Sequence, residues 1–275
     1  MKTSSVAQEK PMSKFIAAMD HSGGSTGGVL KNYDQEYTEE NKMDLVHEMR
    51  LRMVNSPDFN STNIWGAILY QDTVERGMVP ILKAKGIQSF LKVDSGCEEN
   101  GYLKYFKLDK MIDVAHEHEC YGTKMRSIVK SLDVMDMILE QQFALAERIY
   151  NVGLMPIIEP EIPIEHPDKA NMEEALFLRL KAFLDNYKGK CILKLTLPEI
   201  PNTYWLLNQY QNVHKVVGLS GGYSTQEACE RLSKNNNMSA SFSRALSERL
   251  TKGLTNEEFD YIIGFNISNI AAASS

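Results

Sequence analysis

The sequence predicts a (β/α)8 barrel of the TIM type. Short apolar runs rich in β-branched residues recur eight times along the chain and alternate with longer segments, several of them at helical period. Most of these runs are apolar on both faces, as are strands of a parallel sheet that helices cover. Eight strand–helix pairs within about 250 residues are typical of this barrel. An open doubly wound sheet is the alternative.

The predicted strands occupy residues 15–20, 66–70, 89–94, 121–126, 155–162, 191–196, 215–220 and 239–243. Five helices are predicted over residues 38–55, 134–153, 172–189, 224–234 and 255–273. Their ends carry recognisable signals: a capping-box pattern from Thr38 to Asn41, Ser224 or Thr225 as an N-cap, and Gly153 and Gly189 as C′ glycines. No internal repeat or linker interrupts the pattern, so we expect one domain over residues 1–275.

Composition excludes several classes of protein. The net charge of −6 disfavours a nucleic-acid-binding protein, which needs a concentrated basic face. No apolar run approaches the roughly 20 residues that cross a membrane, and the N-terminal residues lack the apolar segment of a secretory signal. The four cysteines form no C-x-x-C pair, and Cys120 and Cys191 lie in apolar runs. This is the usage of a reduced compartment, so we expect a cytoplasmic protein.

Polar residues stand at the end of nearly every predicted strand, where barrel enzymes place their active sites. They are Asp20, Lys92 and Asp94, Lys124 and Arg126, Glu159 and Glu161, Lys194, Ser220, and Ser243 with Arg244. Lys124 and Arg126 are two residues apart and share one face of their strand, as do Glu159 and Glu161. The sequence therefore predicts one polar site at the carboxyl ends of the strands.

Lys194 is the most informative of these residues, because it lies between Leu193 and Leu195 in a core strand. A buried ammonium group is costly unless it is paired or neutralised. A lysine crowded by other cations in a partly desolvated site loses pKa and becomes a nucleophilic amine. We therefore interpret Lys194 as a candidate for Schiff-base formation with a ketone. The alternative for each lysine and glutamate taken alone is a structural ion pair.

The stretch Leu219–Thr225 contains a strand end, a Gly-Gly turn and a helix start. Backbone N–H groups and the helix dipole at such a position bind phosphate. In barrels the recurrent phosphate site follows strands 7 and 8, so Ser220, Gly221, Gly222 and Arg244 are predicted to hold an anion. A plain tight turn is the alternative.

Sequence signals for a cofactor or metal are weak. The glycines after Asp20 lack G-x-G-x-x-G spacing, which argues against a dinucleotide site. His116 and His118 are two residues apart near a helix end, where they do not face each other, and no third ligand is evident. We expect neither a cofactor nor a metal.

Seven motifs in order resemble class I fructose-1,6-bisphosphate aldolase, especially its shorter bacterial-type branch. They are AAMDHSGGST, FLKVDSG, YGTKMRS, IIEPEI, ILKLTLP, LSGGYS and SFSRAL, and they span about residues 12 to 250. The resemblance implies metal-independent, reversible aldol cleavage (EC 4.1.2.13) of fructose 1,6-bisphosphate to dihydroxyacetone phosphate and glyceraldehyde 3-phosphate, in glycolysis and gluconeogenesis. It also implies a homo-oligomer whose partner is a small phosphorylated sugar.

The resemblance assigns roles by motif. Lys194 would form the Schiff base, Glu159 would be the acid/base at C2, and Asp20 would take the proton of the C4 hydroxyl. Glu161 would support the lysine network, and Lys124 would hold the charge beside the imine. Arg126 would lie close by and bind the substrate. The C1 phosphate would be bound by Ser220, Gly221, Gly222 and the Ser243–Arg244 pair, and the C6 phosphate by Ser22, Ser25 and Lys92.

The chain also departs from the longer animal-type enzymes. It ends in NIAAASS without their terminal tyrosine, and Ser243 directly precedes Arg244 where those enzymes have two intervening residues. Three alternatives stay open: the same chemistry on sedoheptulose or tagatose bisphosphate, a non-catalytic sugar-phosphate-binding barrel, and a metal-dependent aldolase.

Overall fold

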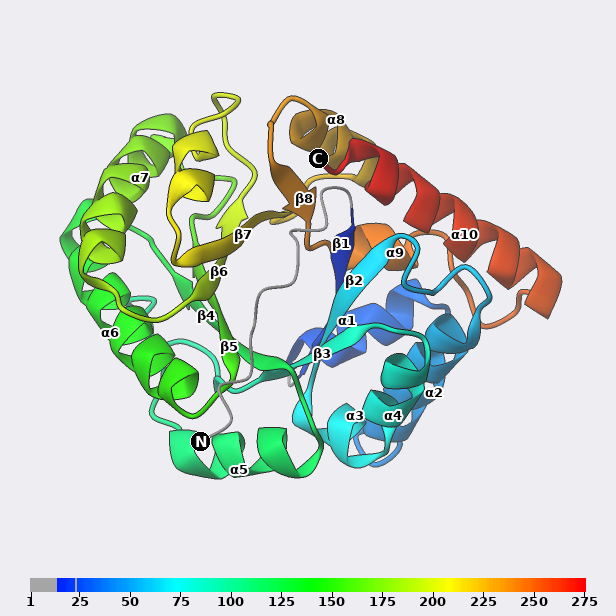
Figure 1. Ribbon diagram of the computed structural model, residues 1–275. Helices are drawn as coiled ribbons and strands as arrows, with labels where there is room; N and C mark the ends of the chain where they lie inside the picture. The colour runs from blue at the N-terminus through cyan, green and yellow to red at the C-terminus, as the bar shows by residue number, and fades with distance from the viewer. Residues whose placement is uncertain (1–13, 23) are drawn as a thin grey trace.

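In the computed structural model, which describes residues 14–22 and 24–275, eight parallel strands surround a central axis and helices surround the strands (Figure 1). The strands are β1 (Phe15–Met19), β2 (Ile64–Leu69), β3 (Gln88–Lys92), β4 (Gly122–Ile128), β5 (Met155–Glu161), β6 (Cys191–Thr196), β7 (Val213–Leu219) and β8 (Met238–Ala240). Each pairs with the next in chain order, without the reversal of a doubly wound sheet. The predicted (β/α)8 barrel is confirmed.

The barrel closes at the seam between β8 and β1, which are the two ends of the strand order. Strand β8 is only three residues long. The backbone N–H of Ala18 donates to the carbonyl of Phe242, just beyond β8, at 3.1 Å. Side chains near this seam therefore help to hold the two edges together.

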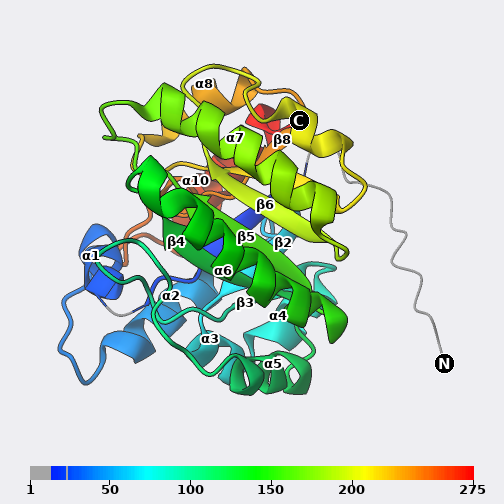
Figure 2. The same ribbon diagram turned by 90° about the vertical axis from the view of Figure 1, so that its left-hand side faces the viewer.

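The helices form the outer layer. They are α1 (Gly24–Asn32), α2 (Lys42–Asn55), α3 (Gln71–Glu75), α4 (Met78–Ala84), α5 (Leu108–Glu117), α6 (Leu132–Asn151), α7 (Lys169–Asn186), α8 (Thr225–Ser233), α9 (Arg244–Ser247) and α10 (Asn256–Ala273), with a 3-10 turn at Trp205–Gln209. Figure 2 shows α6 and α7 side by side over the outside of β5 and β6. Among the described residues no helix is long and apolar enough to span a bilayer.

The helix-end predictions have mixed outcomes. Gly153 follows α6 with a φ of +88°, and the Ser224 hydroxyl accepts the N–H of Glu227, as predicted. Thr38 and Asn41 exchange the two hydrogen bonds of a capping box, but they do so in the turn that precedes α2. Thr38 is therefore not an N-cap.

Gly189 is not the C′ residue of α7, so that prediction is wrong. The helix ends at Asn186 because Tyr187 adopts an extended conformation. A Cβ at Gly189 would lie 2.5 Å from the Tyr187 hydroxyl oxygen, so the glycine permits close packing instead. Its sequence context resembles a helix end, but its role is steric.

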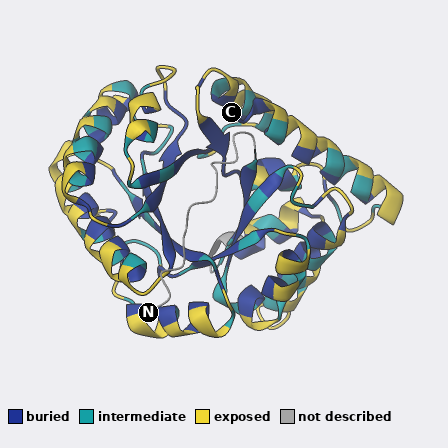
Figure 3. Ribbon diagram, viewed as in Figure 1, coloured by how far each residue is buried: buried dark blue, intermediate teal, exposed yellow. Residues whose placement is uncertain are grey.

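Inside the barrel, the half nearer the amino ends of the strands is apolar, and the half nearer their carboxyl ends is polar. This division explains why a lysine lies within a core strand. The apolar layer contains Ile16, Ala18, Ile68, Phe90, Met155, Ile157, Ile192 and Val217. Side chains on a strand alternate, so Lys194 shares the inner face with Ile192, as Glu159 does with Ile157. Figure 3 shows the buried strands inside the half-exposed helices. Each strand thus runs from the apolar core toward the polar cavity.

Candidate active site

A cavity of about 950 Å³ opens at the carboxyl ends of the strands. Twelve of the fourteen predicted site residues line it: Asp20, Ser22, Lys92, Lys124, Arg126, Glu159, Glu161, Lys194, Ser220, Gly221, Ser243 and Arg244. Gly222 is not among its lining residues. Ser25 belongs to α1, but its side chain lies outside what the structure describes.

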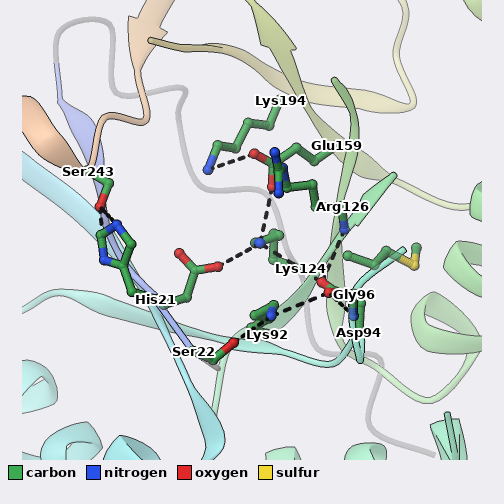
Figure 4. Close-up of polar contacts among 12 residues, drawn as sticks. His21, Ser22, Lys92, Asp94, Gly96, Lys124, Arg126, Glu159, Lys194 and Ser243 are labelled. Carbon is green, nitrogen blue, oxygen red and sulfur yellow. Dashed lines mark hydrogen bonds and ion pairs between the residues drawn. The ribbon is translucent and has the colours of Figure 1, made fainter. Parts of the chain in front are cut away.

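A chain of ion pairs crosses the cavity floor (Figure 4). Lys194 Nζ lies 3.1 Å from Glu159 Oε1, and the other oxygen of Glu159 lies 3.2 Å from Lys124 Nζ. Lys124 Nζ also contacts Asp20 Oδ2 at 2.6 Å. Side chains from β6, β5, β4 and the end of β1 thus form one alternating series of amine and carboxylate. Both lysines and Glu159 are at most 5% exposed.

Lys124 and Asp20, which are neighbours in this series, are both held in their charged forms. Burial alone would lower the pKa of Lys124, but Asp20, Glu159 and Asp94 together raise it well above its ordinary value. Burial would likewise raise the pKa of Asp20, and the charges of Lys124 and Lys194 lower it far below its usual range. Asp20 is therefore held as a carboxylate.

Asp94 organises the loop after β3, although the sequence assigned it no specific role. Its Oδ1 accepts the N–H of Gly96 at 3.0 Å, and its Oδ2 accepts the N–H of Arg126 at 3.2 Å. Its carboxylate also lies 3.4 Å from Lys92 Nζ, which donates to Ser22 Oγ at 2.8 Å. The available signal was its spacing of two residues from Lys92, which places both on one face of the extended chain.

Arg126 and Glu161 form a second ion pair at the mouth of the cavity. Arg126 Nε lies 2.5 Å from Glu161 Oε2, and the Arg126 side chain is 42% exposed. Burial would lower the pKa of Arg126, but the hydrogen bond and charge of Glu161 raise it. Glu161 therefore pairs with an arginine, whereas Glu159 pairs with two lysines, Lys124 and Lys194.

The turn after β7 has the conformation expected of an anion site. Gly221 and Gly222 have φ values of +60° and +135°, which L-residues rarely adopt. No described residue accepts a hydrogen bond from their N–H groups. Arg244 begins α9, and its guanidinium lies 3.7 Å from the position that a Cβ at Gly222 would occupy. Backbone donors and a guanidinium therefore lie together beside the cavity.

His21 is a cavity residue to which the sequence assigned no role in the site. Its ring lies beside Ser243, with Nε2 3.1 Å from Ser243 Oγ (Figure 4). Burial lowers the pKa of His21 to about 4; the Asp20 charge raises it, while those of Arg50, Arg244 and Lys194 lower it further. The ring is therefore neutral at pH 7.

Acid stability should report this state of His21. An unfolded histidine has a pKa of about 6.5, so between pH 6.5 and 4 the unfolded chain binds more protons than the folded one. We expect the free energy of unfolding to fall across this window by roughly 2 kcal/mol more in the wild type than in H21Q. Urea denaturation in MES and acetate buffers measures it. H116Q, at an exposed histidine of α5, should follow the wild type; parallel curves for wild type and H21Q would contradict the expectation.

No three His, Cys, Asp or Glu side chains of the described residues are arranged to hold a metal ion. His116 lies exposed in the last turn of α5, and His118 is the C-cap of that helix. All four cysteines have free thiols, and Cys120 and Cys191 are buried as predicted.

Comparison with solved structures shows the same barrel in Schiff-base aldolases. The fructose-bisphosphate aldolase of Plasmodium falciparum, solved with TRAP and a small-molecule inhibitor, has a TM-score of 0.78 at 20% identity, over 96% of this chain and 91% of that one. An archaeal fructose-1,6-bisphosphate aldolase, whose catalytic lysine is covalently bound to the carbinolamine intermediate, has a TM-score of 0.56 at 12% identity, over 94% of each chain.

Another archaeal fructose 1,6-bisphosphate aldolase gives a TM-score of 0.59 at 12% identity, over 95% of this chain and 94% of that one. No protein-family model matches the sequence. At these identities the comparisons establish a shared fold and single out no branch of these aldolases.

Proposed function

We propose that this chain is a metal-independent aldolase that cleaves fructose 1,6-bisphosphate through an imine on Lys194. The observation that carries the proposal is the series Lys194–Glu159–Lys124–Asp20 at one end of a barrel. It joins an amine, a carboxylate in contact with that amine, and a second carboxylate held ionised. Imine-based carbon–carbon cleavage needs these three groups in one cavity. The solved aldolases that share the fold support the assignment.

The first half of the reaction uses Lys194 and Glu159. The ammonium of Lys194 first passes a proton to Glu159, the resulting neutral amine adds to the C2 carbonyl, and the carbinolamine loses water to give the imine. Glu159 lies 3.1 Å from Lys194 Nζ, so it can supply the proton with which the hydroxyl departs as water. Lys124 lies on the other oxygen of Glu159 and keeps that carboxyl paired with a cation.

The second half uses Asp20. Its carboxylate takes the proton of the C4 hydroxyl, the C3–C4 electron pair moves into the imine, and glyceraldehyde 3-phosphate leaves. A proton returned to C3 converts the enamine to an imine, and water then hydrolyses this to free Lys194 and dihydroxyacetone phosphate. One proton leaves O4 and one is added at C3, so the reaction balances without a redox partner.

The two ends of the cavity suit a substrate with two phosphates. The glycine turn and Arg244 lie after β7 and β8, and Lys92 with Ser22 lies after β3 and β1. We assign the C1 phosphate to the first end and the C6 phosphate to the second. Ser25 stays part of this assignment by motif alone.

Borohydride trapping tests the proposal. Incubating the protein with dihydroxyacetone phosphate, EDTA and sodium borohydride should leave a reduced adduct, which peptide mass spectrometry should locate on Lys194. Triose phosphate release from fructose, sedoheptulose and tagatose bisphosphates would then rank the substrates by kcat/KM. A folded protein that binds the bisphosphate but gives no adduct would favour the non-catalytic binding barrel. Loss of activity in EDTA would favour a metal-dependent aldolase.

A further inference from the structure

His21 lines the cavity but takes no part in the proposed reaction. It immediately follows Asp20 at the end of β1. Its backbone carbonyl accepts a 2.6 Å hydrogen bond from Arg50, which is 1% exposed and also donates to Thr73 Oγ1. A buried arginine of α2 therefore fixes the main chain at His21, and this restricts where the ring can lie.

The His21 ring bridges the barrel seam to the residue beside Arg244. Ser243 Oγ lies 3.1 Å from Nε2 and 3.4 Å from Nδ1 of the ring. One hydroxyl near both nitrogens can form a well-directed hydrogen bond with only one of them. No other described side chain is within hydrogen-bond distance of the ring. One nitrogen is therefore available to a ligand in the cavity.

The charges that face the ring come from four elements. Asp20 of β1 is the anion; Arg50 of α2, Arg244 of α9 and Lys194 of β6 are the cations. Together with burial, this excess of cations keeps the ring neutral. A phosphate dianion next to Arg244 would favour the protonated form of the His21 ring, because it adds two negative charges in a partly desolvated site.

We propose that the imidazole of His21 is a ligand for the phosphate group held by Arg244 and Ser243, and that it takes a proton from solvent when that group binds. The ring then donates an N⁺–H to a phosphate oxygen, which is stronger than a neutral hydrogen bond. This role rests on the proposed function, because that function makes the anion a phosphate ester. It predicts that anions bind more tightly at acidic pH.

Sulfate is the probe of choice, because it remains a dianion from pH 5 to 8 and does not itself take up protons. Calorimetric titration of the full chain at pH 6.0, in MES and in bis-Tris, measures proton uptake per bound sulfate. We expect net uptake by the wild type, and affinity about tenfold higher at pH 5.5 than at pH 8, which corresponds to a return of the ring pKa from about 4 to the ordinary histidine value of about 6.5 when the anion binds.

Matched variants assign the effect to His21. H21Q should bind sulfate with little dependence on pH and with no proton uptake, whereas H116Q should behave as the wild type. If H21Q fails to fold, H21N and the wild-type proton uptake still provide the test. Absence of uptake in the wild type, or equal pH dependence in a folded H21Q, would overturn the proposal. Sulfate binding requires no imine, so failure of borohydride trapping would leave this result unaffected.

Discussion

Replacing Lys194 with methionine should lower kcat for bisphosphate cleavage by roughly 10⁵-fold, the scale seen when a covalent nucleophile is removed. Methionine keeps an unbranched stem of similar volume but cannot form an imine. Glu159 would still have Lys124 at 3.2 Å, so the remaining carboxylate is not left without a cation. We therefore expect a folded protein that still binds the bisphosphate.

The measurement is steady-state triose phosphate release together with calorimetry on the same preparation. K190M is the matched control, because Lys190 directly precedes β6 at the opposite end of the strand from the cavity. It should retain wild-type kcat. Turnover by K194M within tenfold of the wild type would rule out Lys194 as the nucleophile.

Replacing Lys124 with methionine should produce the largest loss of stability among the cavity residues. Its ammonium group lies 2.6 Å from Asp20, 3.2 Å from Glu159 and 4.0 Å from Asp94. Removing one partner from a buried ion pair costs about 3–5 kcal/mol, because an uncompensated charge remains. We expect a loss of this size in the free energy of unfolding at pH 7.5, measured by urea denaturation.

The pH dependence of this loss identifies its cause. The lowered pKa of Asp20 contributes stability that is present above the unfolded carboxyl pKa of about 4 and is lost as the pH falls below it. The gap between wild type and K124M should therefore narrow below about pH 4. K83M removes an equivalent contact to Glu119 at 2.9 Å, but both of those side chains are at least 64% exposed, so a change under about 1 kcal/mol is expected. A similar loss in the free energy of unfolding of K124M and K83M would exclude an uncompensated buried charge as the cause.

Strand period and strand-end chemistry were sufficient to predict the barrel and the charged side chains that line its cavity. Lys194, Glu159 and Lys124 could be placed together because each lies on the inner face of its strand, near the carboxyl end. These features are local in sequence. The ion-pair partners then follow from the neighbouring positions of β4, β5 and β6 in the barrel.

The parts that could not be predicted depend on contacts that form only when the barrel closes. His21 and Ser243 are separated by 222 positions and meet across the β8–β1 seam. Arg50 lies within an amphipathic helix, where arginine ordinarily faces solvent, yet it is buried against the His21 carbonyl. Gly189 shows the converse error, since a glycine after a helical segment was assigned to a cap when its role is close packing.

Along each strand, apolar inward-facing side chains come first and polar ones follow near the carboxyl end. This order also determines where the chain can tolerate insertions and deletions. One residue added within β6 before Lys194 would turn that lysine toward the helices and bring a leucine into the cavity, although no residue identity had changed. The same insertion in the exposed turn at Glu39–Glu40, between α1 and α2, would leave every strand in phase. For this protein, the number of residues between the start of a strand and its cavity end is therefore as strictly constrained as the residues themselves.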